Sequence, residues 1–176
     1  SLRLLGNLPE CLASEGWDVH LVSSPIVGPL DSTPSDFFSH HSVSMTRRVN
    51  PLADLCSLLK WIRLLRRVKP NIIVSSTPKA ALLGMLAGFG LRVDARVYLL
   101  RGLRLETASG MFRWVLSMAE LVTSKCATSV LAVSPSLRQL YISLGLCGPE
   151  KIRVLGSGSS HGVNLEDFRP LQTPGV

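Results

Sequence analysis

The sequence predicts an α/β domain built around a parallel sheet. Short runs of β-prone apolar residues alternate along the chain with longer helical patterns, which is typical of a parallel sheet covered by helices on both faces. Three of the helical patterns begin with a proline that directly follows a helix-capping residue, namely Asn50, Thr77 and Ser134. With 176 residues, of which 46% are hydrophobic, the chain is long enough to bury the core of one domain.

The first half of the chain is expected to open with a helix. Leucines at helical spacing, followed by a glycine, predict this helix over residues 1–15. Strands are predicted at 17–22 and 41–45, with a loop rich in Pro, Ser, Asp and Gly between them. A long helix is predicted at 51–69. Its core-facing side is expected to carry Leu52, Leu55, Leu59, Ile62 and Leu65.

The second half continues the alternation. The expected elements are strand 71–76, helix 78–89, strand 95–100, loop 101–109, helix 111–126, strand 129–133, helix 135–144 and strand 151–155. The continuous β-prone run at 71–76 predicts a central strand, and helix 78–89 is apolar on all sides, which predicts burial against the sheet. One domain is predicted over 1–168, with a linker or chain end at 169–176.

A doubly wound sheet normally begins with a strand whose turn leads into the first helix. Because the first residues here already have a helical pattern, the first strand of the sheet is expected to be missing from this sequence.

Composition narrows the classes of function. The formal net charge is +7, but the basic residues lack interleaved aromatics and match no nucleic-acid reader motif, so no nucleic-acid partner is expected. An anionic small ligand or an anionic membrane surface would account for the charge equally well. No signal peptide and no apolar stretch of the ~20 residues needed to span a bilayer is found, so a cytoplasmic location is expected. The cysteines are interpreted as reduced core residues rather than metal ligands: Cys11, Cys56, Cys126 and Cys147.

The long helix carries a basic stripe of Lys60, Arg63 and Arg67 beside a broad apolar arc. A helix of this kind can lie on a membrane surface. An ordinary packed helix with a solvated basic edge has the same pattern, and it is the interpretation we favour.

Two motif matches near the C-terminus do not predict an enzyme class. Gly156 and Gly158 resemble a dinucleotide-binding fingerprint, but Gly162 falls one position late and no helix follows. The missing fingerprint also argues against a fragment of an NAD-dependent epimerase. Residues 158–162 formally match a Gly-x-Ser-x-Gly nucleophile elbow, but a hydrolase needs a helix and a later histidine, and the only histidine from Ser160 onward is its neighbour.

Two segments that follow predicted strands carry groups suited to a ligand cleft. Thr77 and Lys79 combine a hydroxyl, an ammonium and the amides of a helix N-terminus, which suits a phosphate or a sugar hydroxyl. The next loop could bind an anionic acceptor and its hydroxyls through Arg101, Gly102, Arg104 and Glu106. The alternatives are a simple helix start with a solvated lysine and a salt-bridged surface loop.

Three strings stand at the ends of predicted strands. They are Val-Ser-Ser-Thr-Pro-Lys-Ala-Ala-Leu-Leu-Gly at 74–84, Ala-Arg-Val-Tyr-Leu-Leu-Arg-Gly-Leu-Arg-Leu-Glu-Thr at 95–107 and Gly-Ser-Gly-Ser-Ser-His-Gly-Val-Asn-Leu-Glu-Asp-Phe at 156–168. In this order they resemble the N-terminal half of GT-B glycosyltransferases of the family 4 type. The resemblance implies a Rossmann-like three-layer α/β fold and the acceptor-side domain of a retaining enzyme that builds capsule, lipopolysaccharide or other surface glycans.

The resemblance also implies a nucleotide-sugar co-substrate of the UDP or GDP type, a glycan or lipid-linked acceptor, and no required metal or other cofactor. In this fold the donor nucleotide binds mainly to a C-terminal domain with paired glutamates. The sequence contains no such domain, so the fragment alone is expected to be inactive. A non-catalytic Rossmann-like module that binds a nucleotide or an anionic glycan is the alternative function.

The resemblance assigns expected places to site residues. Lys79, Arg101 and Arg104 are expected to form a cationic wall of the acceptor cleft. The donor-side loop is expected at Gly158, Ser159, Ser160, His161 and Gly162. Many relatives carry a histidine where this chain has Arg101, so the role of that histidine is not transferred and no catalytic residue is assigned. Peripheral contact with the inner face of the membrane is compatible with such an enzyme.

Overall fold

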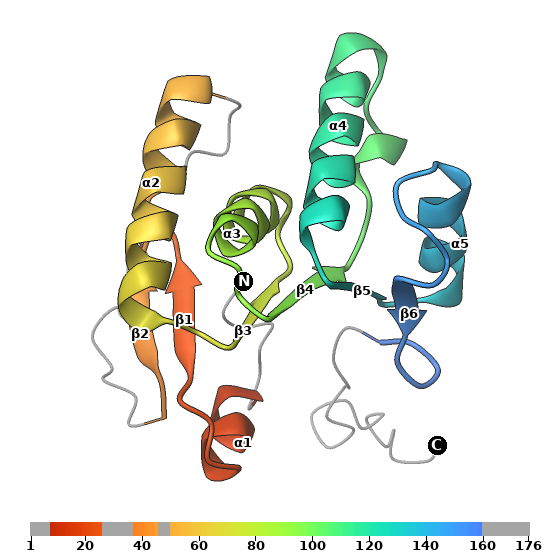
Figure 1. The fold of residues 1–176 in the computed structure, drawn as a ribbon. Helices are drawn as coiled ribbons and strands as arrows, with labels where there is room; N and C mark the ends of the chain where they lie inside the picture. The colour runs from red at the N-terminus through yellow and green to blue at the C-terminus, as the bar shows by residue number, and fades with distance from the viewer. Residues whose placement is uncertain (1–7, 26–36, 46–49, 160–176) are drawn as a thin grey trace, which may run out of the picture.

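A computed structural model describes residues 8–25, 37–45 and 50–159 of the chain. These residues form an alternating series of strands and helices (Figure 1). In chain order the elements are α1 (Leu8–Ser14), β1 (His20–Ser23), β2 (Ser39–Ser42), α2 (Pro51–Val68), β3 (Ile72–Ser75), α3 (Pro78–Gly90), β4 (Ala95–Leu100), the 3-10 turn η3 (Arg104–Glu106), α4 (Gly110–Cys126), β5 (Ser129–Ala132), α5 (Pro135–Ser143) and β6 (Ile152–Val154).

All strand pairs in the described residues are parallel, which confirms the predicted α/β class. Strands β3, β4, β5 and β6 form one sheet in that order, and β1 pairs with β2 in a separate two-stranded sheet. The prediction that 71–76 is a central strand is wrong, because β3 is the end strand of its sheet in the described residues and its residues alternate between exposed and buried. The absent first strand remains a prediction, because residues 1–7 lie outside the described part.

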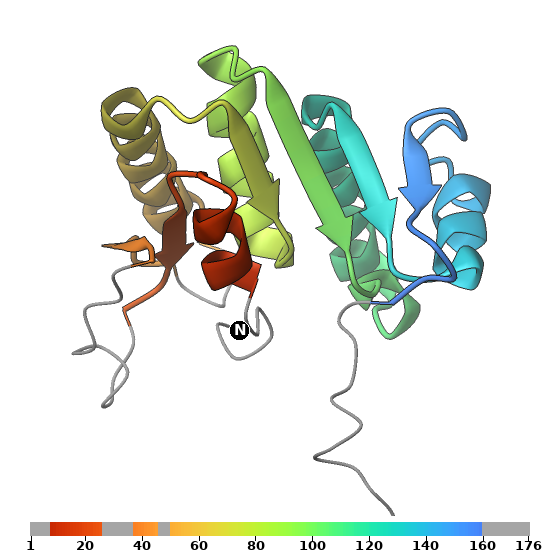
Figure 2. The same ribbon diagram turned by 90° about the horizontal axis from the view of Figure 1, so that it is seen from below.

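The helices are arranged in layers around the strands. Helices α2, α3 and α4 lie on one side and α1 lies on the other, as two perpendicular views show (Figures 1 and 2). Helix α3 packs between α2 and α4, and six of its residues are buried. Its glycines also permit close packing on the sheet: a Cβ on Gly88 would lie 2.8 Å from Ile73 Cδ1 of β3. The predicted burial of this all-round apolar helix is therefore confirmed.

The three proline-started helices begin where the capping residues predicted. Asn50 Oδ1 accepts a hydrogen bond from Ala53 N at 3.2 Å, and Ser134 Oγ accepts one from Leu137 N at 3.2 Å. Thr77 occupies the N-cap position of α3, but its side chain makes no capping hydrogen bond. The backbone carbonyl of Thr77 accepts the first hydrogen bond of the helix, from Ala81 N at 2.7 Å.

Helix α2 buries only part of the predicted face. Leu65 is buried and Ile62 packs partly buried against the core, as predicted, whereas Leu52, Leu55 and Leu59 are exposed. The other buried positions of the helix are Ser57 and Trp61. The physical reason is the neighbouring helix: the Trp61 ring packs over Gly84 of α3, 3.6 Å from where its Cβ would be. The Ser57 hydroxyl oxygen lies 2.8 Å from the carbonyl oxygens of both Ala53 and Ser44 and can donate its proton to either, so a polar residue can be buried there.

The cysteine prediction is also partly wrong. Cys126 is buried and Cys147 is half-buried, as expected for core residues, but Cys11 and Cys56 are exposed. Cys56 lies on the same outward side of α2 as the three exposed leucines, so its exposure has the same cause.

Candidate functional site

The carboxyl ends of four parallel strands meet at one edge of the larger sheet. The turns that leave this edge are the β3–α3 turn at Thr77, the loop after β4 that starts at Arg101, the β5–α5 turn at Ser134 and the loop after β6. In open parallel α/β sheets, ligands bind outside this edge. The fold therefore brings the predicted site segments to one side of the molecule.

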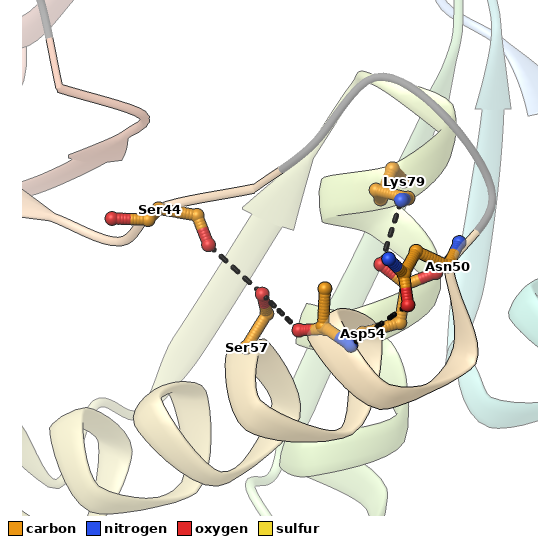
Figure 3. Close-up of polar contacts among 6 residues, drawn as sticks. Ser44, Asn50, Asp54, Ser57 and Lys79 are labelled. Carbon is orange, nitrogen blue, oxygen red and sulfur yellow. Dashed lines mark hydrogen bonds and ion pairs between the residues drawn. The ribbon is translucent and has the colours of Figure 1, made fainter.

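Lys79, in the first turn of α3, is held by an acidic residue that the sequence analysis did not single out. Its Nζ lies 2.6 Å from Asp54 Oδ1, and the two side chains are only 23% and 22% exposed (Figure 3). Asp54 Oδ2 also accepts a hydrogen bond from Asn50 N at 3.4 Å. The carboxylate thus connects the first turns of α2 and α3, and it partly neutralises the charge that was predicted to face a ligand.

The loop after β4 carries two arginines and is attached to the core by buried leucines. Leu103 and Leu105 are buried, whereas Gly102 and Arg104 are exposed. Arg104 begins the η3 turn, and its carbonyl accepts a hydrogen bond from Thr107 Oγ1 at 3.3 Å. The alternation fixes the loop backbone to the core while leaving its polar groups at the sheet edge. The backbone of Glu106 ends the η3 turn, and its side chain lies outside the described residues.

Arg101 is the predicted site residue with the most unusual environment. It is half-buried directly after β4, and its Nε is buried without a hydrogen-bond partner among the described residues. A buried guanidinium N–H without an acceptor is energetically unfavourable, so this donor favours an anionic or carbonyl oxygen nearby. The geometry therefore makes Arg101 a stronger candidate for anion binding than the ion-paired Lys79.

The start of the loop after β6 packs against the β5–α5 turn. Gly158 has φ +86°, and a Cβ there would lie 2.7 Å from the Val133 carbonyl oxygen and 3.2 Å from Ser134 Cα. Only glycine fits this backbone position without strain. Ser159 is exposed. The remaining predicted residues of this loop lie outside the described part: Ser160, His161 and Gly162.

A buried polar cluster joins the larger sheet to two helices, and sequence reasoning missed it. Glu120 of α4 accepts hydrogen bonds at Oε2 from the hydroxyls of Tyr98 and Tyr141, at 2.9 and 3.1 Å. Burial raises the pKa of Glu120, and the two hydroxyl donors oppose this shift. Burial, with the Glu120 charge and hydrogen bond as smaller causes, also raises the pKa of Tyr98. Since Tyr98, Tyr141 and Glu120 are all buried, the cluster connects β4, α4 and α5 within the core.

A histidine pair lies in the smaller sheet. His20 Nδ1 and His41 Nε2 are 2.9 Å apart, and His20 Nε2 lies 3.2 Å from Asp18 Oδ2. Burial lowers the pKa of His41, followed by the charges of His20, Arg67 and His40. No group of three or more histidine, cysteine, aspartate or glutamate residues suited to a metal ion occurs in the part of the chain that the structure describes.

None of the helices in the described ranges is both long enough and apolar enough to cross a membrane.

The sequence of this chain is similar to two known glycosyltransferases. Over 169 residues the chain is 40% identical to the capsular polysaccharide biosynthesis glycosyltransferase CapM of Staphylococcus aureus, covering 96% of this chain and 44% of that protein. It is 26% identical over 170 residues to the UDP-Gal:alpha-D-GlcNAc-diphosphoundecaprenol alpha-1,3-galactosyltransferase of Escherichia coli, covering 94% and 42%. The chain thus spans less than half the length of these curated relatives.

Two solved structures share the fold. The UDP-GlcNAc 2-epimerase of Methanocaldococcus jannaschii superposes with a TM-score of 0.57 at 15% identity, covering 88% of this chain and 42% of that one. The S. aureus MnaA–UDP co-structure gives 0.52 at 14% identity, covering 80% and 44%. At these identities the likeness concerns the fold alone, and it agrees with the predicted Rossmann-like half of a GT-B fold. By sequence, residues 3–158 match the family described as glycosyl transferase 4-like domain. The chain therefore belongs to the glycosyl transferase 4-like family.

Proposed function

We propose that this chain is the acceptor-side domain of a retaining glycosyltransferase in surface polysaccharide synthesis, such as capsule or lipopolysaccharide. The observation that carries the proposal is the 40% identity, over 96% of the chain, to a capsular polysaccharide biosynthesis glycosyltransferase. The complete protein would transfer a sugar from a UDP- or GDP-type donor to a glycan or lipid-linked acceptor, without a required metal or other cofactor.

The carboxyl edge of the larger sheet supports this assignment physically. Glycosyl transfer from a nucleotide sugar creates negative charge on the leaving phosphate and positive charge on the sugar, and fixed polar groups in a closed cleft can stabilise both. Arg101 and Arg104 lie at that edge, and Lys79 lies in the first turn of the adjacent helix. Arg101 has a buried donor without a partner in the described residues, so it is our first candidate for contact with an anionic acceptor group.

The second curated relative supports a lipid-linked acceptor and a UDP-sugar donor, because its name specifies a diphosphoundecaprenol acceptor and UDP-Gal. An acceptor with a polyprenyl tail remains in the membrane, so the enzyme would work at the cytoplasmic surface as a peripheral protein.

In the complete protein the donor and the acceptor would bind to two different domains. The present chain spans less than half of each curated relative, and the donor nucleotide would bind mainly to a C-terminal domain. Closure of two domains around the substrates excludes water and favours transfer over hydrolysis. Residues 1–176 alone are therefore expected to show no sugar transfer.

The test compares the complete protein with residues 1–176 in the same assay. Each is incubated with radiolabelled UDP- and GDP-sugars and a membrane extract that supplies lipid-linked acceptors, and label in the organic phase is counted. We expect transfer with the complete protein and none with the fragment. Turnover by the fragment would contradict the division of labour. Nucleotide or glycan binding by the complete protein, with no transfer to any acceptor, would favour the non-catalytic binding module instead.

A further inference from the structure

Helices α2 and α4 expose large apolar side chains in their N-terminal halves. Leu52 is 78% exposed, Met111 is 77% exposed and Trp114 is 60% exposed. We call the full set the apolar tips: Leu52, Leu55 and Leu59 on α2 with Met111, Phe112, Trp114 and Met118 on α4. Single exposed apolar residues are ordinary, but this many gathered on two helices indicate an interaction surface.

The N-terminal halves of the two helices, which carry the apolar tips, lie on the same side of the strands. Both pack against α3, one on each side of it. Figure 1 shows that α2 and α4 rise away from the sheet side by side, with their N-terminal ends farthest from it. The apolar tips are thus the protruding parts of this side of the domain.

Charge is distributed along the same helices in a matching way. The second half of α2 exposes four cations, Lys60, Arg63, Arg66 and Arg67, and α4 exposes Lys125 in its last turn. Within the first half of α4, the exposed Arg113 directs its guanidinium back to the Leu105 carbonyl at 3.5 Å. Helix α2 therefore changes from apolar to basic along its axis, from the protruding end toward the sheet, whereas α4 has one exposed lysine in its last turn.

The outward faces of α2 and α4 carry no exposed carboxylate. Asp54 is the one carboxylate of α2, and it is paired with Lys79. Glu120 is the one carboxylate of α4, and it is buried between two tyrosines. The outward faces consequently combine apolar and basic side chains without an exposed carboxylate, which is complementary to an anionic surface with an apolar interior.

We propose that the apolar tips of α2 and α4 insert end-on into an anionic lipid bilayer, with the basic second half of α2 at the level of the lipid headgroups. The order of chemistry along α2 matches a bilayer followed from its core outward, with acyl chains first and anionic headgroups second. The exposed Trp114 of α4 suits the interface between these two layers. A protein partner would need an apolar and an acidic region placed to fit two separate protrusions, whereas a bilayer offers both at every point.

The proposal differs from a helix lying flat on the membrane, because both helices contribute their ends. It deepens the proposed function, since it assigns the surface that would bring the domain to a lipid-linked acceptor. Its test uses lipid binding rather than sugar transfer, so it can fail independently of the transferase assignment.

The first experiment measures co-sedimentation of the complete protein with vesicles of phosphatidylcholine alone or mixed with phosphatidylglycerol. We expect binding to the anionic vesicles that weakens with added salt. The combined variant Leu52→Ser, Met111→Ser and Trp114→Ser should lower the partition coefficient by about tenfold or more. Because these side chains are exposed, its unfolding temperature should stay near the wild-type value. The matched control, Val74→Ser on β3, removes a side chain that is 63% exposed elsewhere and should leave binding unchanged.

Charge is tested in the same assay. Arg63→Gln with Arg66→Gln should weaken binding to anionic vesicles, and Arg153→Gln on β6 serves as the charge control. Equal partition of the wild type, the tip variant and the charge variant would overturn the proposal. A tip variant that lost self-association in ultracentrifugation while keeping its vesicle binding would also overturn it and would assign the tips to a protein contact.

The second experiment locates the insertion with the chain's own tryptophans. Brominated acyl chains quench tryptophan only when the indole enters the bilayer. Trp114 lies in the tips, whereas Trp17 is 52% exposed in the segment between α1 and β1. We expect lipid quenching of the wild type and of Trp17→Phe, and its loss in Trp114→Phe. Quenching that persists in Trp114→Phe and disappears in Trp17→Phe would refute the proposed orientation.

Discussion

Replacing Asp54 with asparagine is expected to destabilise the domain by about 1–3 kcal/mol, because it removes the ion pair between the Asp54 carboxylate and Lys79. Two limits set this range. Exposed ion pairs contribute about 0–1 kcal/mol, whereas removing one partner of a buried pair costs about 3–5 kcal/mol. The Asp54–Lys79 pair lies between these limits, since its side chains are 22% and 23% exposed and its charged atoms are 2.6 Å apart. The substitution also alters the acceptor for the Asn50 amide at the start of α2.

A double-mutant cycle measures this effect directly. Asp54→Asn, Lys79→Gln and the double variant are unfolded by denaturant and by heat, and about 2 kcal/mol should appear as a fall in Tm of roughly 4–8 °C. We expect the two single effects to be non-additive by about 1–2 kcal/mol, as for residues in direct contact. Asp18→Asn is the matched control, because that carboxylate is 86% exposed beside His20 and its loss should change stability by less than about 0.5 kcal/mol.

Two results would refute the reasoning about this ion pair. One is a cycle whose single effects add within about 0.3 kcal/mol, which is the behaviour of independent sites. The other is an Asp54→Asn variant as stable as Asp18→Asn, which would show that partial burial does not strengthen the pair.

Turnover of the complete protein separates the structural role of Lys79 from the proposed role in the cleft. If the ammonium also contacts a developing anion, Lys79→Gln should lose about 2–4 kcal/mol of transition-state stabilisation. Turnover is measured at a temperature at which both the wild type and the variant are folded. Asp54→Asn keeps the Lys79 ammonium and should therefore lose much less transition-state stabilisation. Near-normal turnover of Lys79→Gln at such a temperature would limit this residue to its structural role.

Three other predictions concern Arg101, the loop after β6 and the buried carboxyl. Arg101→Ala in the complete protein should lower kcat/KM by about 10²-fold or more, as for loss of a charge-stabilising donor; an unchanged kcat/KM would mean that the acceptor binds elsewhere. Gly158→Ala should destabilise by about 1–3 kcal/mol, because its φ is +86° and its Cβ would lie 2.7 Å from a carbonyl oxygen. Gly102→Ala should be nearly neutral, since nothing lies within 4 Å of its Cβ position, and equal unfolding temperatures of the two variants would contradict this difference. Burial raises the pKa of Glu120 above 4.5, so the stability it contributes is complete below that pH and is lost as pH rises through the raised value. The stability of Glu120→Gln relative to the wild type should therefore improve as pH rises from about 4, and a pH-independent difference in denaturant unfolding would contradict the assignment.

The order of the elements could be predicted from the sequence because local chemistry determines it. The proline-started helices begin at Pro51, Pro78 and Pro135, and β4 occupies residues 95–100, as predicted. Capping residues and prolines restrict the backbone within a few positions, so no tertiary information is required. The burial of α3 was also predictable, because a helix that is apolar on all sides has no face suited to water.

The contacts that define the candidate site depend on neighbours that the sequence does not identify. Leu52, Leu55 and Leu59 have helical spacing, but Ser57, Trp61 and Leu65 share an equally regular spacing of four residues. Gly84 of α3 decides between these faces, because it leaves room for the Trp61 ring. The same orientation of α2 turns Asp54 toward Lys79, so an error about the buried face also hid the ion pair.

This orientation of α2 connects the candidate site with the proposed membrane surface. With Trp61 facing α3, Asp54 is directed to Lys79 and away from the outward face. Rotation of the helix to bury Leu52, Leu55 and Leu59 would instead expose Trp61 and move the carboxylate away from its partner. The same packing therefore neutralises Lys79 and leaves the outward face of α2 without an exposed carboxylate. Arg101 remains the cleft arginine whose buried donor lacks a partner in the described residues, so anion recognition at this edge should depend more on the loop after β4 than on the first turn of α3.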